Sequence, residues 1–191
     1  MSEISFRNLS VIYGSSTDGT KEIAEKCTKK VFWDEDKGLG ATRNLGVRKA
    51  VSAFVAIIDT DVVTTKDWCK HLIAHFEDPK VAAVIETTLY GYGCPPIQRL
   101  FEYWQWTIPE GYGCTNTIFK RDSVLKVGNF DGGMHVARDD YDLHKLMLAA
   151  GYKWVWAKKL LFIIQLTYLN VSNTFAGGRV ALPIYADSQI K

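Results

Sequence analysis

Ala53-Phe54-Val55-Ala56-Ile57-Ile58-Asp59-Thr60-Asp61 is an unbroken apolar run that ends in two carboxylates. A short apolar run with polar boundaries is typical of a strand buried on both faces. Carboxylates at the end of such a strand are costly to bury unless a cation, hydrogen-bond donors or solvent meets them. The stretch therefore predicts oxygen ligands for a hard metal ion at a strand end, and an acidic strand end without metal is the simpler alternative.

Strand and helix patterns alternate on both sides of this run. Strands separated by helices of this length predict an α/β fold with a mostly parallel sheet and helices on both faces. Thr65 precedes one of these helices and is expected to cap it. The expected strands cover residues 9–13, 31–33, 53–59 and 81–85, and the expected helices cover residues 21–30, 41–51 and 67–76.

Length and composition are those of an ordinary globular domain. The chain has 191 residues, of which 47% are hydrophobic, so it can bury one substantial core. We expect a catalytic α/β domain over residues 1–157 and a C-terminal extension over residues 158–191. The net charge of +2 and the scattered basic residues give no support to a nucleic-acid partner.

Cysteine usage and the ends of the chain bear on its location. The four cysteines have no C-x-x-C spacing, and the N-terminus has no long apolar core of a secretory signal. These features predict a reducing, cytoplasmic setting. The apolar run over residues 160–169 is shorter than the roughly 20 residues of a spanning helix. A buried element is the first interpretation of this run, and peripheral contact with a membrane surface is the second.

A second acidic cluster, Asp139-Asp140-Tyr141-Asp142, opens a segment whose apolar residues recur at helical spacing until Gly151. Carboxylates in the first turn of a helix are kept ionised by the helix macrodipole, so one of them is suited to act as a base. Helix capping by Asp139 is the simpler alternative. Residues 90–114 are rich in aromatic residues, glycine and proline, which fits either an acceptor-binding wall or packing beneath a long loop.

Several segments occur in an order shared with a known family. They resemble the S-T-D-G-T turn, the A-R-N-x-G stretch, the D-x-D motif, the R-R…G-G-F-D segment and the E-D-x-D-L motif of the inverting glycosyltransferases of family 2. The ordered set covers most of the chain, from about Leu9 to Trp156, and it is specific although each part alone is weak. The matching segments are residues 16–20, 37–46, 59–61, 120–131 and 139–143.

The resemblance implies a GT-A fold and transfer of a sugar from a nucleotide-diphosphate donor to the hydroxyl of a glycan, lipid-linked or protein acceptor, with inversion. It implies that Asp61, helped by Asp59, holds Mg²⁺ or Mn²⁺ against the diphosphate. Asp140 would deprotonate the acceptor, and Asp139 would share that role or orient it.

Two further residues correspond to positions on the donor side of the family's site. Arg43 would lie near the nucleotide or the phosphates, and pairing with a carboxylate is its alternative role. Asp18 would contact the donor or only cap its helix.

The chain also departs from the family near its beginning. A first strand-helix unit is not found ahead of the strand at residues 9–13, and Tyr13-Gly14 replaces an acidic pair that contacts the nucleoside. These departures favour a second hypothesis, a non-catalytic protein that binds nucleotide sugars or glycans. They also leave a strand edge that favours association through β-pairing. A third hypothesis is a phosphate-transfer or hydrolase domain that uses Asp59 as its nucleophile.

Overall fold

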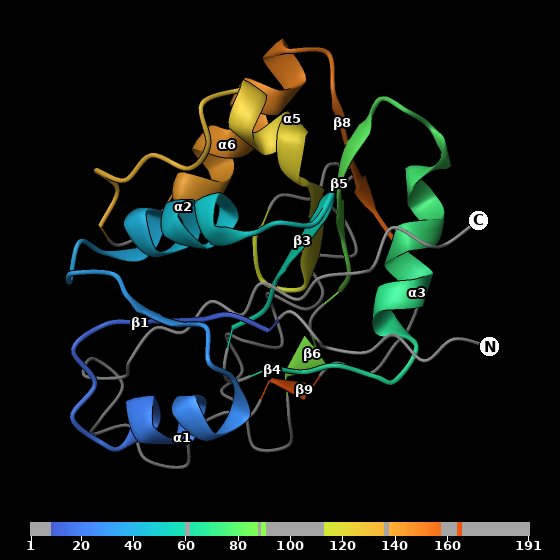
Figure 1. Ribbon diagram of the computed structural model, residues 1–191. Coiled ribbons are helices and arrows are strands. Elements are labelled where there is room, and N and C mark those ends of the chain that lie inside the picture. Colours follow the sequence, from blue (N-terminus) through green and yellow to red (C-terminus); the bar gives the residue numbers. More distant parts are fainter. Residues whose placement is uncertain are drawn as a thin grey trace.

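The fold is known from a computed structural model that describes residues 9–59, 62–87, 89–90, 113–135, 138–157 and 164–165. The main sheet has four strands in the order β3-β7-β5-β8 (Figure 1). Their apolar sequences explain their central place, because most of their side chains are buried. The strands are β3 (Phe54–Ile57), β5 (Val81–Ile85), β7 (Thr117–Lys120) and β8 (Lys153–Trp156).

Strand directions bring several chain segments to one edge of this sheet. β5 is parallel to β8, whereas β7 is antiparallel to both β3 and β5. β3, β5 and β8 therefore end at the same edge at which β7 begins. β7 is the one described strand of the main sheet that runs against the others. Antiparallel strands do not need a crossover helix between them.

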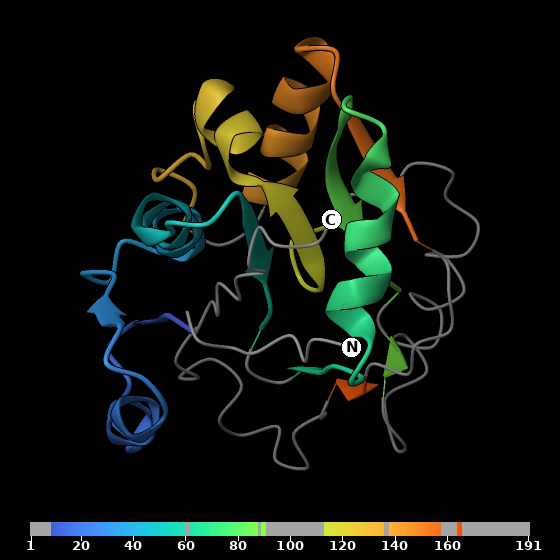
Figure 2. The same ribbon diagram turned by 45° about the vertical axis from the view of Figure 1, so that its right-hand side comes forward.

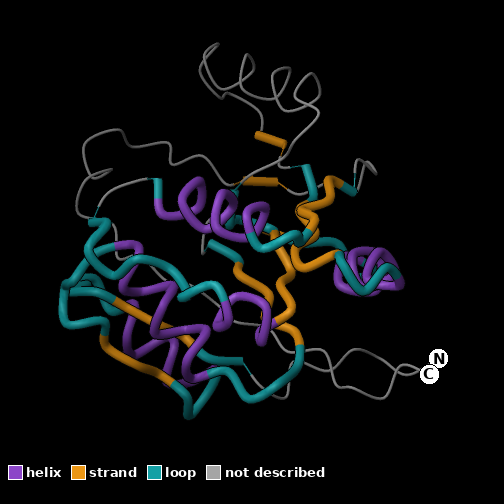
Figure 3. Tube along the Cα trace, turned by 90° about the horizontal axis from the view of Figure 1, so that it is seen from above, coloured by secondary structure: helices purple, strands orange, loops and turns teal. Residues whose placement is uncertain are grey.

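Helices cover both faces of the main sheet, as the sequence predicts. One face carries α2, α5 and α6, and the other carries α3 and the 3-10 turn η1 (Figures 1 and 2). The view from above shows helices on two sides of the strands (Figure 3). The bounds are α2 (Leu39–Lys49), α3 (Trp68–Ile73), η1 (Ala74–Glu77), α5 (Arg121–Lys126) and α6 (Asp139–Ala149).

Two smaller sheets adjoin the main one. The first pairs β1 and β2 in parallel, and α1 packs against it through Ala24. The second has the order β4-β9-β6, so the segments that leave β3 and β5 both pair with β9. The bounds are β1 (Val11–Tyr13), β2 (Val31–Trp33), α1 (Thr20–Cys27), β4 (Val62–Val63), β6 (Leu89–Tyr90) and β9 (Ile164–Gln165).

The expected cap on α3 is wrong. The hydroxyl of Thr65 is buried and makes no hydrogen bond within the described residues. Instead, the carbonyl of Thr65 accepts a hydrogen bond of 3.1 Å from the N–H of Trp68, the first residue of the helix. The helix begins three residues after Thr65, so the backbone turn supplies the acceptor that the side chain was expected to supply.

Two glycines allow the start of α2 to pack against the loop of residues 131–135. A Cβ atom on Gly40 would lie 2.1 Å from the carbonyl oxygen of Asp131, and one on Gly38 would lie 2.6 Å from the Cα of His135. The N–H groups of Leu39 and Gly40 donate to carbonyls of this loop at 3.1 and 3.0 Å. Backbone carbonyls of the loop therefore accept hydrogen bonds from the first N–H groups of α2, and this close contact requires residues without a side chain.

Candidate active site

Acidic residues follow three of the strands. Asp34 comes after β2, Asp59 after β3 and Glu86 after β5. Asp59 is half-buried, and one of its carboxylate oxygens accepts a hydrogen bond from the hydroxyl of Thr115, which lies just before β7. The predicted acidic strand end therefore lies at the edge where three strands of the main sheet end.

Arg43 and Asp139 form a buried ion pair that joins α2 to α6. One guanidinium nitrogen, Nη1, lies 2.9 Å from each carboxylate oxygen of Asp139, and the two side chains are 6% and 1% exposed. Asp139 is the first residue of α6, so the pair fixes the start of this helix. Of the two roles left open for Arg43, the geometry supports pairing with a carboxylate, because both carboxylate oxygens of Asp139 accept hydrogen bonds from it.

Cys114 lies among the charged groups of the site. Burial raises the pKa of its thiol well above the ordinary value; Arg43 opposes this, while Asp140, Asp139 and Asp59 add to it. Burial alone would lower the pKa of Arg43, but Cys114 in its ionised form, Asp139 and Asp59 outweigh burial and raise it. The pKa of the Cys114 thiol therefore responds to carboxylates from the end of β3 and from the start of α6.

Asp140 stands beside the ion pair in the first turn of α6. It is half-buried, and its Oδ1 accepts a hydrogen bond of 2.8 Å from the N–H of Tyr141. A carboxylate at this end of a helix is stabilised by the positive end of the macrodipole. Asp140 is therefore the direct neighbour of the buried ion pair, and its role as the base stays a prediction.

The oxygen ligands fit a hard divalent cation in kind. Mg²⁺ and Mn²⁺ take one or two protein carboxylates and fill the remaining positions with phosphate oxygens and water. Asp59 offers such a carboxylate at the open edge of the sheet, whereas Asp61 lies outside the described residues. Within the ranges that the structure describes, no group of three or more His, Cys, Asp or Glu side chains is arranged to hold a metal by itself.

Asp18 lies in the turn before α1. Its Oδ1 accepts hydrogen bonds from the N–H and the hydroxyl of Thr20, at 3.1 and 2.5 Å, and these bonds lower the pKa of the carboxyl group. The side chain acts as a local turn acceptor at the start of the helix. A contact with a donor remains a prediction for this residue.

Other acids take up the space beside Gly14. A Cβ atom on Gly14 would lie 3.5 Å from Asp36 and 3.7 Å from Asp34. Asp34 is buried and accepts a hydrogen bond of 2.5 Å from the hydroxyl of Thr42 in α2, while Asp36 accepts one of 2.8 Å from the N–H of Ser15. The end of β1 is therefore bordered by carboxylates that the chain supplies after β2.

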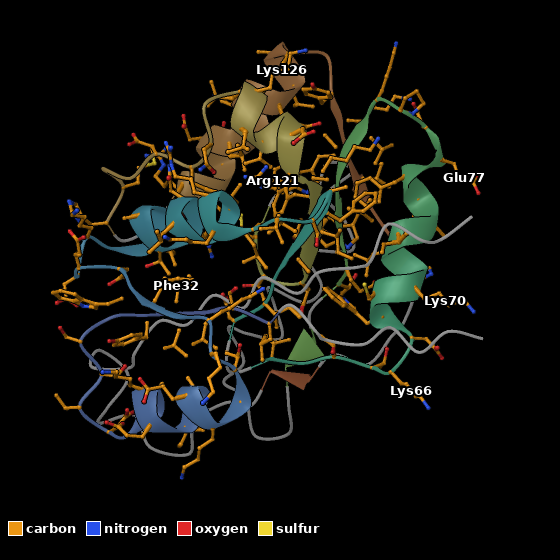
Figure 4. All side chains as sticks on the ribbon, in the orientation of Figure 1. Phe32, Lys66, Lys70, Glu77, Arg121 and Lys126 are labelled. Atoms are coloured by element: carbon orange, nitrogen blue, oxygen red, sulfur yellow. The ribbon has the colours of Figure 1, made fainter. Side chains whose placement is uncertain are left out.

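Several residues of the family-like segments have structural roles. The amide of Asn44 donates to the carbonyl of Phe130 at 2.5 Å, and the amide of Asn129 donates to the carbonyl of Asn44 at 3.2 Å. Arg121, which Figure 4 labels at the base of α5, donates from Nε to the carbonyl of Val47 at 3.2 Å. Two of these bonds are accepted by backbone carbonyls of α2 and one by the carbonyl of Phe130, and together they hold α2 against the segment of residues 121–130.

Sequence reasoning did not single out Cys114 and Thr115. Both precede β7, and only the antiparallel direction of that strand brings them to the edge where β3 ends. Glu86 was missed as well, although it repeats the pattern of Asp59, an acid directly after an apolar run. That repeated pattern was the available signal for Glu86.

Residues 8–142 match the family described as Glycosyl transferase family 2. The chain belongs to glycosyl transferase family 2. This match covers more than half of the chain and includes Arg43, Asp59, Asp139 and Asp140. The family 2 assignment agrees with the order of motifs in the sequence and with the way the fold gathers their side chains.

Known proteins similar to this family 2 chain are also glycosyltransferases. A pre-mycofactocin glycosyltransferase of Mycobacterium tuberculosis is 32% identical over 130 residues, which is 60% of this chain and 27% of that protein. A glucosyl-dolichyl phosphate glucuronosyltransferase of Haloferax volcanii is 28% identical over 112 residues, 51% of this chain and 36% of that protein. The chain therefore spans about a third or less of these relatives.

Two solved structures share the fold. Staphylococcus aureus TarS in complex with UDP superposes with a TM-score of 0.57 and 19% identity, covering 78% of this chain and 48% of TarS. The mannosyltransferase PcManGT of Pyrobaculum calidifontis, in complex with GDP-Man and Mn²⁺, superposes with a TM-score of 0.62 and 18% identity. This match covers 84% of this chain and 48% of PcManGT. The GT-A-like α/β fold class is confirmed. Among the described helices, none is long and apolar enough to cross a membrane.

Proposed function

We propose that this family 2 domain transfers a sugar from a nucleotide-diphosphate sugar to an acceptor hydroxyl, with inversion and with Mg²⁺ or Mn²⁺. The observation that carries the proposal is the Arg43–Asp139 pair. It joins α2 to α6 through two contacts of 2.9 Å, and Asp59, Asp139 and Asp140 all raise the pKa of Cys114, which supports a shared site for the carboxylates of β3 and α6. A proton acceptor and a metal-binding carboxylate are the two groups that this reaction needs from the protein.

In the proposed step, Asp140 accepts the proton of the acceptor hydroxyl. The acceptor oxygen forms a new bond to the anomeric carbon on the face opposite the diphosphate. The bond between the anomeric carbon and the diphosphate oxygen breaks, and its electron pair stays with the diphosphate. A bound divalent cation, held by Asp59 with Asp61, would stabilise this negative charge on the leaving group.

Asp139 has a positioning role in the proposed transfer step. Its carboxylate is occupied by Arg43 and almost completely buried, so it is a poor candidate for accepting the acceptor's proton. We propose instead that Asp139 orients Asp140. Arg43 then holds Asp139 through the buried ion pair, and its guanidinium supplies a positive charge beside the carboxylates.

The class of donor is proposed from the relatives. TarS was solved with UDP and with UDP-GlcNAc, and PcManGT with GDP-Man and Mn²⁺. We infer a uridine or guanosine diphosphate sugar as donor and a glycan, lipid-linked or protein hydroxyl as acceptor. A cytoplasmic setting, with or without peripheral membrane contact, accords with such donors and stays a prediction.

A donor screen tests the proposal. The purified protein is incubated with UDP-sugars and GDP-sugars and with simple sugar acceptors, with Mn²⁺ or with EDTA, and release of UDP or GDP is measured. We expect release from one donor class in Mn²⁺ only, and proton NMR of the product should show the inverted anomer. Nucleotide binding without turnover of any donor would support the non-catalytic hypothesis.

A further inference from the structure

Glu86 is a buried carboxylate for which the proposed reaction has no use. The residue directly follows β5 and is 1% exposed. One oxygen, Oε1, accepts a hydrogen bond of 3.0 Å from the N–H of Thr87. The other, Oε2, lies 3.6 Å from Nε2 of His71, which forms an ion pair with it when the imidazole is protonated. A carboxylate this far from water needs such partners.

His71 comes from the face of α3 that packs against the sheet. In Figure 4 the labelled side chains of Lys66, Lys70 and Glu77 point outward, away from the sheet. His71 is only 19% exposed at its side chain, and its neighbour Leu72 is completely buried. The contact between His71 and Glu86 therefore lies inside the protein, between α3 and the end of β5.

The same contact closes a ring of interactions around Asp59. The hydroxyl of Thr115 donates to Asp59, and the carbonyl of the next residue, Asn116, accepts a hydrogen bond of 3.1 Å from the N–H of Glu86. From His71 the chain runs back through α3 and β4 to Asp59, whose carbonyl accepts a bond of 3.1 Å from Val62. Glu86 is thus linked to Asp59 through Asn116 and Thr115 on one side and contacts α3 through His71 on the other.

We propose that Glu86 and His71 form a positioning pair that sets Asp59 in the geometry required to bind the divalent cation. The inference rests on the proposed function, because the cation at Asp59 is itself proposed. Neither residue contacts the cation or the substrate. A buried ion pair contributes little net stability compared with neutral groups of the same shape, so its main effect here is on geometry.

Affinity for Mn²⁺ tests this role directly. Binding of Mn²⁺ is measured by electron paramagnetic resonance in the presence of UDP and, separately, of GDP. We expect Glu86→Gln and His71→Gln each to weaken Mn²⁺ binding about tenfold, the size of effect that groups behind a metal ligand have. Affinity for the nucleotide in EDTA should not change, since the pair acts through Asp59.

An exposed ion pair on the same sheet provides a control for the loss of an ion pair elsewhere in the fold. Lys153 at the start of β8 lies 2.7 Å from Asp78, at the opposite end of the sheet. Asp78→Asn should leave Mn²⁺ affinity unchanged. The double variant His71→Gln/Glu86→Gln removes both ionisable groups together, so it should fold even if one single variant does not. It should lose no more affinity than a single variant, because both act through one contact.

The outcomes separate the inference from the proposed function. If the wild-type protein binds Mn²⁺ and all folded variants of the pair bind it equally well, the positioning role is overturned while the proposed function stands. If the wild-type protein does not bind Mn²⁺ with either nucleotide, both are overturned. Equal losses in Asp78→Asn would also overturn the positioning role, because the effect would then follow from general destabilisation.

Discussion

At the scale of single residues, Asp140 and Asp142 offer a direct comparison. Both are acidic, and both lie in the first turn of α6. Of the two, Asp140 raises the pKa of the Cys114 thiol, which Asp59 raises as well. We predict that Asp140→Asn lowers the rate of transfer by about 10²- to 10⁴-fold, the size of effect expected from loss of a general base, with little change in stability.

Asp142→Asn is the control for this prediction. It changes the charge of the same helical turn by the same amount, so it should keep most of the activity. The measurement is release of nucleoside diphosphate from the donor that the wild-type protein uses. Equal losses in the two variants would mean that the negative charge of the helix start matters and that Asp140 is not the base.

Cys69 carries a prediction about pH. Burial raises the pKa of its thiol from 9.0 to about 11. Because the folded protein resists ionisation more than the unfolded chain, this thiol contributes stability that is fully present below pH 9 and is lost as the pH rises through 11. We expect Cys69→Ala to flatten the fall in unfolding free energy between pH 8 and 11, by on the order of 2 kcal/mol.

Urea denaturation at a series of pH values measures this effect. The slope with pH is the readout, so any constant loss of stability from the smaller side chain does not matter. Cys27→Ala, at an exposed cysteine, should leave the slope unchanged. A slope equal to that of the wild-type protein in Cys69→Ala would show that this thiol does not titrate differently in the folded state.

At the scale of elements, two glycines in α2 should respond in opposite ways. A Cβ atom on Gly40 meets a carbonyl oxygen at 2.1 Å, whereas one on Gly46 has its nearest neighbour at 3.8 Å. Gly40→Ala should therefore push the loop of residues 131–135 away and cost about 1–3 kcal/mol. Gly46→Ala should be neutral or stabilise by up to about 1 kcal/mol, because alanine favours a helix. Urea denaturation compares them, and equal effects would contradict the packing of α2.

The Arg43–Asp139 pair makes a second prediction for α2 and α6. Asp139→Ala leaves a buried guanidinium unpaired, so we expect a loss of about 3–5 kcal/mol in unfolding free energy. The exposed pair Lys21–Glu25, at 3.8 Å, serves as control, and Glu25→Ala should cost less than about 1 kcal/mol. The double variant Arg43→Met/Asp139→Leu should recover stability but not activity, since Asp140 loses its anchor. Full activity in that double variant would contradict the positioning of Asp140 by the pair.

Elements with strong local signals were predicted well from the sequence. The apolar runs at residues 31–33 and 81–85 became β2 and β5 with the expected bounds, and the acidic cluster began α6 at Asp139. The direction of β7 was not predictable, because it depends on pairing with β3 and β5, which are distant in sequence. That direction determines which edge receives Thr115 and Cys114, so these residues were missed with it.

At the scale of the whole molecule, the sequence indicated the carboxylates of the site but not how they are joined. The residue pattern left Arg43 with two roles, and only the fold shows that α6 brings Asp139 within 2.9 Å of it. Glu86 and His71 meet through the arrangement of α3 against β5, which no spacing in the sequence indicates. Metal binding, the identity of the donor and inversion at the anomeric carbon stay proposals.

The most direct test of the central claim is isothermal titration of the folded protein with UDP and with GDP, first in Mn²⁺ and then in EDTA. We predict that one nucleotide binds in Mn²⁺, that EDTA weakens its binding strongly, and that Asp59→Asn has the same effect as EDTA. Binding that is equal in Mn²⁺ and EDTA, or no binding of either nucleotide by the folded protein, would contradict a metal-dependent donor site at the end of β3.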